Sequence, residues 1–239
     1  GQLVREIDAL GGEMARCTDR TGIQFKMLNR SRGPAVHSPR AQADRFAYEK
    51  DMQAVCRAQD NLTIRECVVE DLIDQNDVIA RIKTSSGEDI TARAVIVCTG
   101  TFMGGTLHHG MTTTPGGRVG EEPAMGLTDA YRRLGFEVGR MKTGTCARVH
   151  KDSIDTSVMT AQPGDADPRP FSFSTPIAGF NPNRVVCWLT STSEKTHDII
   201  RANLDRSPLF SGKIQGIGPR YCPSIEDKVM RFPEKTSHH

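Results

Sequence analysis

The fold class is decided by one stretch, TARAVIVCTG at residues 91–100. Its centre, from Ala94 to Cys98, is continuously apolar, and the run ends at Thr99-Gly100. A short apolar run without alternation is typical of a strand buried on both faces of a parallel sheet. The stretch therefore predicts an α/β fold with a buried strand over residues 94–98.

The segments before this stretch predict a small antiparallel meander. Three segments rich in Val, Ile and Thr are separated by the turn-forming sequences DQND and SSGE. Such residues join strands that lie side by side. The predicted strands are 63–69, 78–84 and 89–92, and the turns are 74–77 and 85–88.

Nearer the start of the chain, two helices flank a predicted strand. Apolar spacing and a Gly pair indicate a helix over Leu3–Gly12, and alternation indicates a strand over Ile23–Met27. Ser38 followed by Pro39 has the form of an N-cap and a first helical position, so we expect the second helix over Pro39–Ala58.

After Gly100 the pattern changes to glycine-rich loops and then to a loop-rich region. A helix is expected over Pro123–Leu134, closed by Gly135, followed by a strand over Phe136–Met141. Beyond Thr143 the chain is rich in Pro, Asp, Ser and Gly, which favours an inserted loop-rich domain. Within it we expect a strand over 185–189 and a helix over 193–204, with Ser191 and Glu194 as a capping box.

Composition excludes several classes of protein. The 239 residues contain 31 basic and 29 acidic side chains, so nucleic acid can be bound only through local groups of charge. No apolar run approaches the roughly 20 residues that a membrane span needs. The seven cysteines form no CxxC pair, which argues against a disulfide framework and against structural zinc. We therefore expect a cytoplasmic protein that binds no metal.

The sequence PGGRVG at 115–120 is suited to an anion. Residues without a side chain allow consecutive backbone N–H groups to point at one phosphate, and Arg118 can add a bidentate contact. A plain surface turn is the alternative. The chain contains no GxGxxG between a strand and a helix, so the main pyrophosphate loop of a dinucleotide domain is missing. We expect the chain to be a fragment that begins after that loop.

Cys222 is the candidate nucleophile. Pro223 follows it, and Glu226 and Asp227 come soon after, a pattern that predicts a helix start. A thiol at the positive end of a helix, near Arg220, is shifted toward the reactive thiolate. A buried structural cysteine is the alternative.

Basic residues in the loops are candidate phosphate contacts. One group comprises Arg118, Arg140, Lys142 and Arg148, and an earlier one comprises Arg30, Arg32 and Arg40. Binding through such side chains falls steeply with salt, whereas solvated surface charge is the alternative.

Eight motifs in chain order are similar to those of the tRNA uridine 5-carboxymethylaminomethyl modification enzymes, also called the glucose-inhibited division protein A family. They run from the first residue to the last. The motifs are REIDALGG (5–12), GIQF (22–25), GPAV (33–36), RAQADR (40–45), GGR (116–118), GR (139–140), KTGT (142–145) and GPRYCPSIEDKVMRF (218–232).

The resemblance implies a fold and a division into domains. The fold would be a partial FAD/NAD(P)-binding Rossmann-like domain of the glutathione-reductase type with a β-meander, plus an inserted α+β domain. Residues 1–142 would belong to the FAD-binding domain, and residues 143–239 would form the inserted domain on the nicotinamide and substrate side.

The resemblance also implies an activity for the parent protein. That protein would add a carboxymethylaminomethyl-type group to C5 of the wobble uridine of tRNA, using FAD, NADH and methylenetetrahydrofolate. A GTPase would be its partner, and the parent would be a homodimer. The fragment alone would be inactive.

Site residues follow from the matched positions. Cys222 matches a family cysteine proposed as a nucleophile or redox participant. The expected FAD contacts are Val69, Thr99, Gly100, Gly116, Gly117 and Ala124, the last where the family often has serine. The expected nicotinamide contacts are Gly218, Pro219, Arg220, Tyr221, Cys222, Pro223, Ser224, Ile225, Glu226, Asp227, Lys228, Val229, Met230, Arg231 and Phe232.

Two alternatives remain open at this point. One is the related folate- and FAD-dependent tRNA uracil-5 methyltransferase, which is shorter and should lack much of residues 151–206. The other is a binding fragment without catalysis or flavin.

Overall fold

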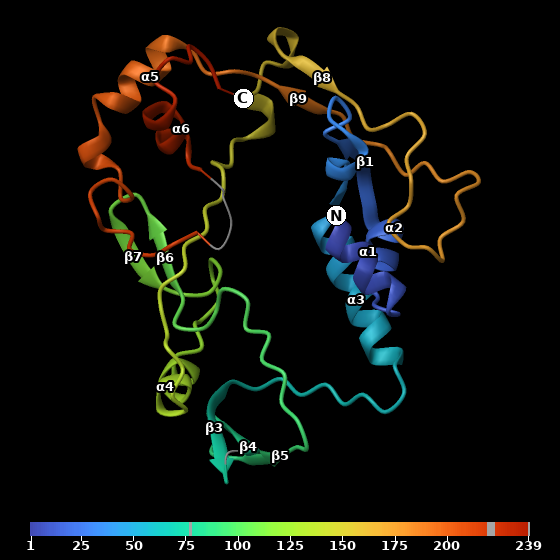
Figure 1. Ribbon diagram of the computed structural model, residues 1–239, viewed down its shortest axis with the longest axis vertical. Helices are drawn as coiled ribbons and strands as arrows, with labels where there is room; N and C mark the ends of the chain where they lie inside the picture. Colours follow the sequence, from blue (N-terminus) through green and yellow to red (C-terminus); the bar gives the residue numbers. More distant parts are fainter. Residues whose placement is uncertain (77, 219–222, 239) are drawn as a thin grey trace. The chain divides into compact units, whose positions relative to one another are not determined.

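The computed structural model describes residues 1–76, 78–218 and 223–238 (Figure 1). Contacts divide the chain into two compact units, each made of two separate segments of sequence. Unit 1 comprises residues 1–64 and 149–190, and unit 2 comprises residues 65–148 and 191–239. Each unit is described by itself.

Unit 1 begins with helices α1 (Gln2–Ala9) and α2 (Met14–Thr21), followed by an antiparallel pair of strands. Strand β1 (Gly22–Leu28) pairs with β2 (Ser38–Ala43), and the 3-10 turn η1 (Pro34–Val36) lies in the loop between them. Gly11 ends the first helical segment with φ of 91°, which glycine adopts easily. The first predicted helix and the strand over 23–27 are confirmed.

The predicted helix over 39–58 is wrong in its first turns. Helix α3 spans Arg45–Ala58, and its N-cap is Asp44, whose side chain accepts the backbone N–H groups of Phe46 and Ala47 at 3.0 Å. Ser38 and Pro39 instead belong to β2. Pairing with β1 satisfies the backbone there, and this tertiary contact overrides the local capping signal.

The second segment of unit 1 is mostly loop. It contains the 3-10 turns η2 (Lys151–Ser153) and η3 (Thr156–Val158), and strands β8 (Thr160–Gln162) and β9 (Cys187–Leu189), which pair antiparallel. The predicted strand over 185–189 is confirmed in its last three residues. Phe171 of this segment packs with Phe25 and Ala15, so a single apolar cluster joins the two segments.

Unit 2 contains the predicted meander. Strands β3 (Val69–Gln75), β4 (Val78–Thr84) and β5 (Asp89–Thr91) form an antiparallel sheet in the order β3-β4-β5. The turn between β3 and β4 includes Asn76 with φ of 51°, a conformation that asparagine tolerates better than most residues. The first strand, predicted over 63–69, is found over Val69–Gln75 and shares only Val69 with the predicted range, so this placement is wrong.

The buried strand predicted over 94–98 is also wrong. No residue of this run belongs to a strand, and Ile96 is 89% exposed. Val95 and Val97 pack on the cluster of Leu72, Leu127 and Ala130. One side of the run is thus covered, but within the described residues no strand pairs with it, and an extended segment without a partner forms no ladder.

The glycine-rich region forms a hairpin and a helix. Strands β6 (Thr106–His109) and β7 (Thr112–Pro115) pair antiparallel, and helix α4 (Gly126–Arg133) follows, ending before Gly135 with φ of 86°. The predicted helix over 123–134 is confirmed. The predicted strand over 136–141 is wrong, since only Met141 forms an isolated bridge, to Ile217.

The last elements are helices α5 (Glu194–Arg201) and α6 (Ile225–Arg231), with the 3-10 turn η4 (Leu204–Arg206) after α5. The capping box of α5 is formed by Ser193 and Thr196, so the expected pair of Ser191 and Glu194 is wrong. Buried Val229 of α6 and His197 of α5 belong to this part of the unit.

The architecture is mixed α/β, with four small antiparallel sheets among the described residues. The compact units differ from the predicted boundary between residues 142 and 143, which concerns the domains of a longer protein and stays a prediction. In the part of the chain that the structure describes, no helix is long and apolar enough to cross a membrane.

Candidate functional site

Five of the six predicted FAD contacts gather around one turn of unit 2, residues 99–105. Phe102 donates its N–H to Thr99 O at 3.1 Å and accepts the N–H of Ala124 at 2.9 Å. Gly104 donates to Ala124 O at 2.8 Å, and Gly116 donates to Gly105 O at 3.1 Å. Thr99, Gly100, Gly116, Gly117 and Ala124 are therefore neighbours, although 25 positions separate the first from the last.

Val69, the sixth predicted contact, is held against the same region by α4. The start of α4 lies on β3, where a Cβ added to Gly126 would come within 2.3 Å of Glu70 O. Val69 packs on the cluster that includes Leu127 of α4. The close approach of helix and strand requires glycine at position 126.

Gly116 and Gly117 have a structural role of their own. Both are buried, and an added Cβ would lie 2.8 Å from Leu107 Cδ1 at Gly116 and 2.2 Å from Phe102 Cδ1 at Gly117. Internal packing thus explains both glycines. The anion loop predicted for residues 115–120 stays a prediction.

The region fits part of a cofactor site. The Oγ1 atom of Thr128 in α4 is buried without a hydrogen-bond partner in this structure, and a Cβ added to Gly104 would lie 3.1 Å from it. Gly100, with φ of 57°, has open space where a side chain would be. An unsatisfied hydroxyl and an open glycine suit a polar ligand at the 99–105 turn. Ala124 donates its backbone N–H to Phe102 O and accepts the N–H of Gly104, so its N–H is already used within the protein.

Two of the predicted tRNA contacts are engaged with the protein. Arg118 forms an ion pair with Glu121, with Nε donating to Oε1 at 2.6 Å. Arg140 donates to Gly104 O at 2.8 Å and to Thr106 Oγ1 at 3.0 Å. Arg140 thereby fixes the turn that carries the candidate cofactor residues. Both side chains remain exposed, but a phosphate would compete with these contacts.

The other two predicted contacts, Lys142 and Arg148, differ from this pair. Arg148 is exposed and Lys142 is half-buried, and no ion pair to either is formed within the described residues. Their charges are therefore available to an external anion.

The segment predicted to bind nicotinamide is described only in part. Pro219, Arg220, Tyr221 and Cys222 lie outside the described residues, so the role of Cys222 stays a prediction. Helix α6 begins at Ile225, with Ser224 as its N-cap and Asp227 completing a capping box. The helix start predicted from Pro223, Glu226 and Asp227 is confirmed, and Glu226 and Asp227 lie in the first turn. Ser224 supplies a side-chain acceptor for the backbone N–H of Asp227 at 3.1 Å.

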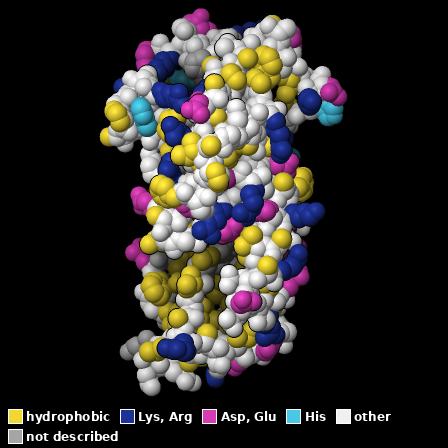
Figure 2. All heavy atoms as spheres, turned by 90° about the vertical axis from the view of Figure 1, so that its right-hand side faces the viewer, with side chains coloured by type: hydrophobic (Ala, Val, Ile, Leu, Met, Phe, Trp, Pro, Cys, Tyr) yellow, Lys and Arg dark blue, Asp and Glu magenta, His cyan; other side chains and the backbone are white. Residues whose placement is uncertain are grey.

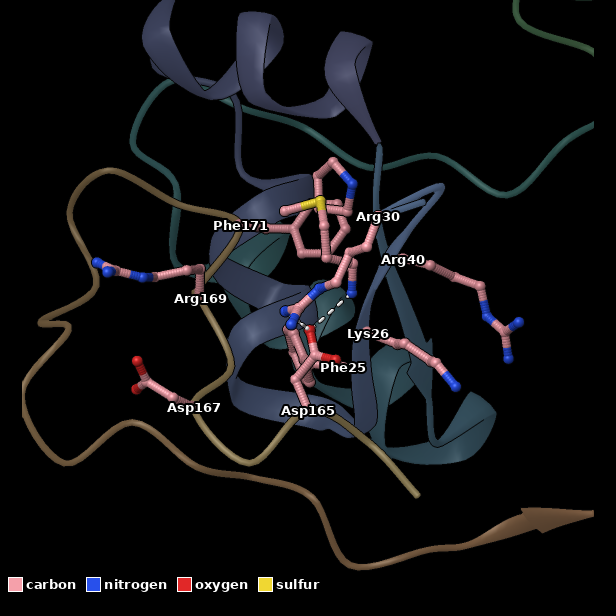
Figure 3. Close-up of a pocket in the computed structure, with 10 residues that line it drawn as sticks. Phe25, Lys26, Arg30, Arg40, Asp165, Asp167, Arg169 and Phe171 are labelled. Atoms are coloured by element: carbon pink, nitrogen blue, oxygen red, sulfur yellow. Dashed lines mark hydrogen bonds and ion pairs between the residues drawn. The ribbon is translucent and has the colours of Figure 1, made fainter. Parts of the chain in front are cut away.

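A basic pocket lies in unit 1, on strands β1 and β2 (Figure 3). Asp165 is its fixed anion, accepting the N–H of Met27 at 2.8 Å and the guanidinium of Arg30 at 2.6 Å. In Figure 3 the side chains of Lys26 and Arg40 point away from Phe25 and Asp165, while Asp167 and Arg169 lie on the opposite side of the hollow. The hollow itself has a volume of about 20 Å³.

Sequence reasoning noted Arg30 and Arg40 but missed Lys26, Asp165 and Arg169. Lys26 lies two residues before the end of β1, and Arg40 lies two residues after the start of β2. In an antiparallel hairpin such positions face each other, and this spacing in the sequence could have predicted the pair. It was hidden because residues 39–43 were expected to be helical. Asp165 and Arg169 are distant in sequence and carry no signal that links them to β1.

The remaining polar groups are less suited to chemistry. Burial raises the pKa of Cys17 to about 12, which keeps that thiol protonated. Among the described residues, no three His, Cys, Asp or Glu side chains form a group able to hold a metal ion. Figure 2 shows basic side chains dispersed among acidic ones over the face it presents.

A family model described as "Glucose inhibited division protein A" matches residues 1–239. A protein of Chlorobaculum tepidum named tRNA uridine 5-carboxymethylaminomethyl modification enzyme MnmG is 52% identical over 240 residues, covering all of this chain and 38% of that protein. The Aquifex aeolicus protein of the same name is 50% identical over 243 residues, covering 100% and 39%. The chain thus spans about two fifths of the length of these relatives.

A solved structure supports the fold. The structure of Aquifex aeolicus GidA in its form I crystal is similar to this chain with a TM-score of 0.89 and 50% sequence identity. The likeness covers 100% of this chain and 40% of that one.

Proposed function

The chain belongs to the glucose inhibited division protein A family, and from this premise we propose that it is part of an FAD-dependent enzyme that modifies the wobble uridine of tRNA. In full, the proposed reaction adds a carboxymethylaminomethyl-type group to C5 of that uridine. Because the chain spans only part of its relatives, the activity is proposed for a longer parent protein.

One observation carries this proposal. Relatives that are about half identical to the chain over its whole length bear the name of this tRNA modification enzyme. The shorter uracil-5 methyltransferase is disfavoured because residues 151–206, which it should lack, align with these relatives and contain β8, β9 and α5.

FAD is the proposed cofactor, and it would supply redox chemistry to the reaction when bound. The residues around the 99–105 turn would hold it: Thr99, Gly100, Gly116 and Gly117, with Val69 and Ala124 beside them. Thr128 Oγ1 is buried there without a hydrogen-bond partner, so a polar group of the cofactor would satisfy it. Arg140 holds the turn in position through Gly104 O and Thr106 Oγ1.

The proposed nucleophile is Cys222. Its thiolate would add to C6 of the uracil ring, and the electron pair of the C5–C6 double bond would move to C5 and O4. C5 would then attack a one-carbon electrophile derived from methylenetetrahydrofolate. Loss of the C5 proton would expel tetrahydrofolate and leave an exocyclic methylene at C5, to which an amine, glycine or ammonium, would add. Departure of the thiolate from C6 would then restore the C5–C6 double bond. NADH is the proposed reductant, bound along residues 218–232.

The proposed partners of the parent protein are tRNA, a GTPase and a second copy of itself, and its proposed location is the cytoplasm. The candidate tRNA contacts with available charge are Lys142 and Arg148. A binding fragment without catalysis is the alternative for the isolated chain.

A genetic experiment tests the function. In a strain that depends on the full-length parent, Cys222→Ser should abolish the modified wobble uridine, measured by mass spectrometry of digested tRNA. Cys67→Ser, which changes an exposed cysteine, is the matched control and should leave the modification intact. Unchanged modification in the Cys222 variant would remove this thiol from the mechanism. Unchanged modification after deletion of the whole gene would refute the proposed function.

A further inference from the structure

We infer that Arg140 is a positioning residue that sets the predicted nicotinamide segment, residues 218–232, at a fixed place relative to the 99–105 turn. This role rests on the proposed function, because it takes FAD as the ligand of the turn and NADH as the ligand of the segment. The described contacts of Arg140 are to the protein, so it would act through the two segments and not on a cofactor itself. The role differs from the tRNA contact predicted for this side chain.

The side chain of Arg140 forms the first tie, to the 99–105 turn and the strand that follows it. Nη1 donates to Gly104 O at 2.8 Å, and Nη2 donates to Thr106 Oγ1 at 3.0 Å. A planar guanidinium presents these two donors in a rigid fork, which the single ammonium group of a lysine does not reproduce. The fork therefore holds the end of the turn and the start of β6 in one orientation.

The backbone of Arg140 forms the second tie, to the residues just before the nicotinamide segment. Ile217 donates its N–H to Arg140 O at 3.2 Å and accepts the N–H of Lys142 at 3.0 Å, so residues 141 and 217 form a parallel bridge. Gly218, the first residue of the segment, follows directly in the sequence. Through its side chain and its carbonyl, Arg140 thus connects the turn to the start of the segment.

Gly216 allows the two backbones of the bridge to approach each other. A Cβ added there would lie 2.7 Å from Arg140 O, and the residue has φ of 128°, where an L side chain is strained. The side chains of Met141 and Ile217 are 77% and 81% exposed, so packing of this pair contributes little to the bridge. Its geometry depends instead on the backbone hydrogen bonds and on the glycine.

A fixed spacing between the two segments matters for the proposed redox step. Hydride transfer breaks the C4–H bond of the dihydronicotinamide and carries the hydride, with its two electrons, to the flavin ring, which leaves NAD⁺ and anionic reduced flavin. Reacting atoms must lie about 3–3.5 Å apart, and a misplacement of about 1 Å can slow a reaction about 100-fold. Lys213 also binds the loop between β6 and β7, through Met111 O, so loss of one tie should shift the segment without releasing it.

Hydrogen exchange in the cofactor-free chain of 239 residues tests the ties themselves. Arg140→Lys should speed exchange roughly three- to tenfold in two places, the turn at residues 104–105 and the bridge at residues 142 and 217. Gly216→Ala should speed exchange at the bridge alone. Gly212→Ala is the matched control: Gly212 also has positive φ, 76°, but nothing lies within 4 Å of its added Cβ. It should leave both places unchanged.

Flavin reduction in the full-length parent, purified with FAD, tests the consequence. After mixing with NADH in the absence of oxygen, the loss of flavin absorbance gives the rate of hydride transfer. At saturating NADH this rate should fall about tenfold or more in Arg140→Lys and in Gly216→Ala, but not in Gly212→Ala. Because Gly216 makes no contact with the turn, Gly216→Ala should retain its FAD and should need about the same NADH concentration for half-maximal rate.

Several outcomes would overturn the inference. They are unchanged exchange at residues 142 and 217 in Arg140→Lys, equal rates of flavin reduction in Gly216→Ala and Gly212→Ala, and a wild-type parent whose flavin NADH does not reduce. Loss of FAD from both Arg140→Lys and Gly216→Ala would show that these residues only hold the cofactor. The proposed function is decided separately, by wobble-uridine modification in cells, which another reductant could still support.

Discussion

The carboxylate of Asp19 in α2 accepts the backbone N–H of Phe171 at 2.7 Å, joining the two sequence segments of unit 1. The same carboxylate accepts the N–H of Ser172 at 2.9 Å and the hydroxyl of Thr175 at 2.7 Å. Asp19 is 7% exposed, so these three donors would lose their partner far from water. One side chain therefore fixes a loop that has little secondary structure of its own.

Replacement of Asp19 by asparagine should destabilise unit 1 by about 1–3 kcal/mol, because an amide N–H₂ would face at least one of the three donors. The free energy of unfolding would be measured by urea denaturation followed by circular dichroism. Asp60→Asn, in an exposed position after α3, is the matched control and should stay within about 0.5 kcal/mol of wild type. Equal stability of the two variants would contradict the role given to Asp19.

Gly117→Ala should cost about 1–3 kcal/mol, because its Cβ would overlap the ring of Phe102. Gly139→Ala is the control: nothing lies within 4 Å of that Cβ, so little change is expected. Thermal unfolding of the two variants checks this prediction. If Gly117→Ala were neutral, packing would not explain the glycine, and the proposed cofactor role would gain support.

Acid should weaken an ion pair between α2 and α3. The Arg20 guanidinium, 2.7 Å from Asp51 Oδ2, holds the pKa of Asp51 below its usual value. The stabilisation is therefore present above about pH 4, the pKa region of an unfolded chain, and is lost as the pH falls through the lower folded pKa. Asp51→Asn should lower stability at pH 7 by about 0.5–1 kcal/mol, since Arg20 is nearly half exposed.

Urea denaturation between pH 2 and 7 tests this ion pair. The decline in stability with acid should be shallower in Asp51→Asn than in wild type. Glu49→Gln, an exposed carboxylate on the same helix, should leave the decline unchanged. Parallel acid profiles for wild type and Asp51→Asn would exclude the ion pair as their cause.

Thiol labelling should separate the cysteines by burial. Cys17 has no exposed surface and a pKa of about 12, so it should not react with a disulfide reagent at pH 8. Cys67, Cys98 and Cys146 are exposed and should react in the folded chain. Cys17→Ala should leave the number of reactive thiols unchanged in buffer and reduce it by one in denaturant. A decrease by one in buffer would show that Cys17 is accessible.

Lys26→Gln and Arg40→Gln should each stabilise unit 1, by about 0.2–1 kcal/mol, because they remove the like-charge repulsion across β1 and β2. The gain should shrink as salt screens the charges of the wild-type chain. Thermal unfolding at low and high ionic strength measures it. Variants that lose stability at every salt concentration would show that these side chains support the fold instead.

Sequence reasoning located the elements that depend on local signals. The meander was predictable because β4 is bounded by turn-forming residues on both sides, and α4 was predictable because Gly135 marks its end. The errors share one cause, which is dependence on distant partners. Residues 94–98 have strand composition, but no strand in the described part of the chain pairs with them, whereas Ser38-Pro39 has capping chemistry but pairs with β1.

Part of the candidate site was predictable from the sequence, and part of it was not. The predicted FAD contacts came from the family resemblance, and the structure adds the 99–105 turn as the element that brings five of these residues together. The basic pocket could not be predicted, because Asp165 and Arg169 approach β1 only through the tertiary fold. Local patterns carry no information about such approaches.

The interleaved segments of unit 1 have a consequence for synthesis on the ribosome. Residues 1–64 cannot complete their core until residues 149–190 emerge, because Phe25 needs Phe171 and Asp19 needs the backbone beside it. At about 5–20 residues per second, the 84 intervening residues take roughly 4 to 17 s to translate. Throughout this interval the first segment exposes apolar surface, so nascent chains of this length should be targets for chaperones.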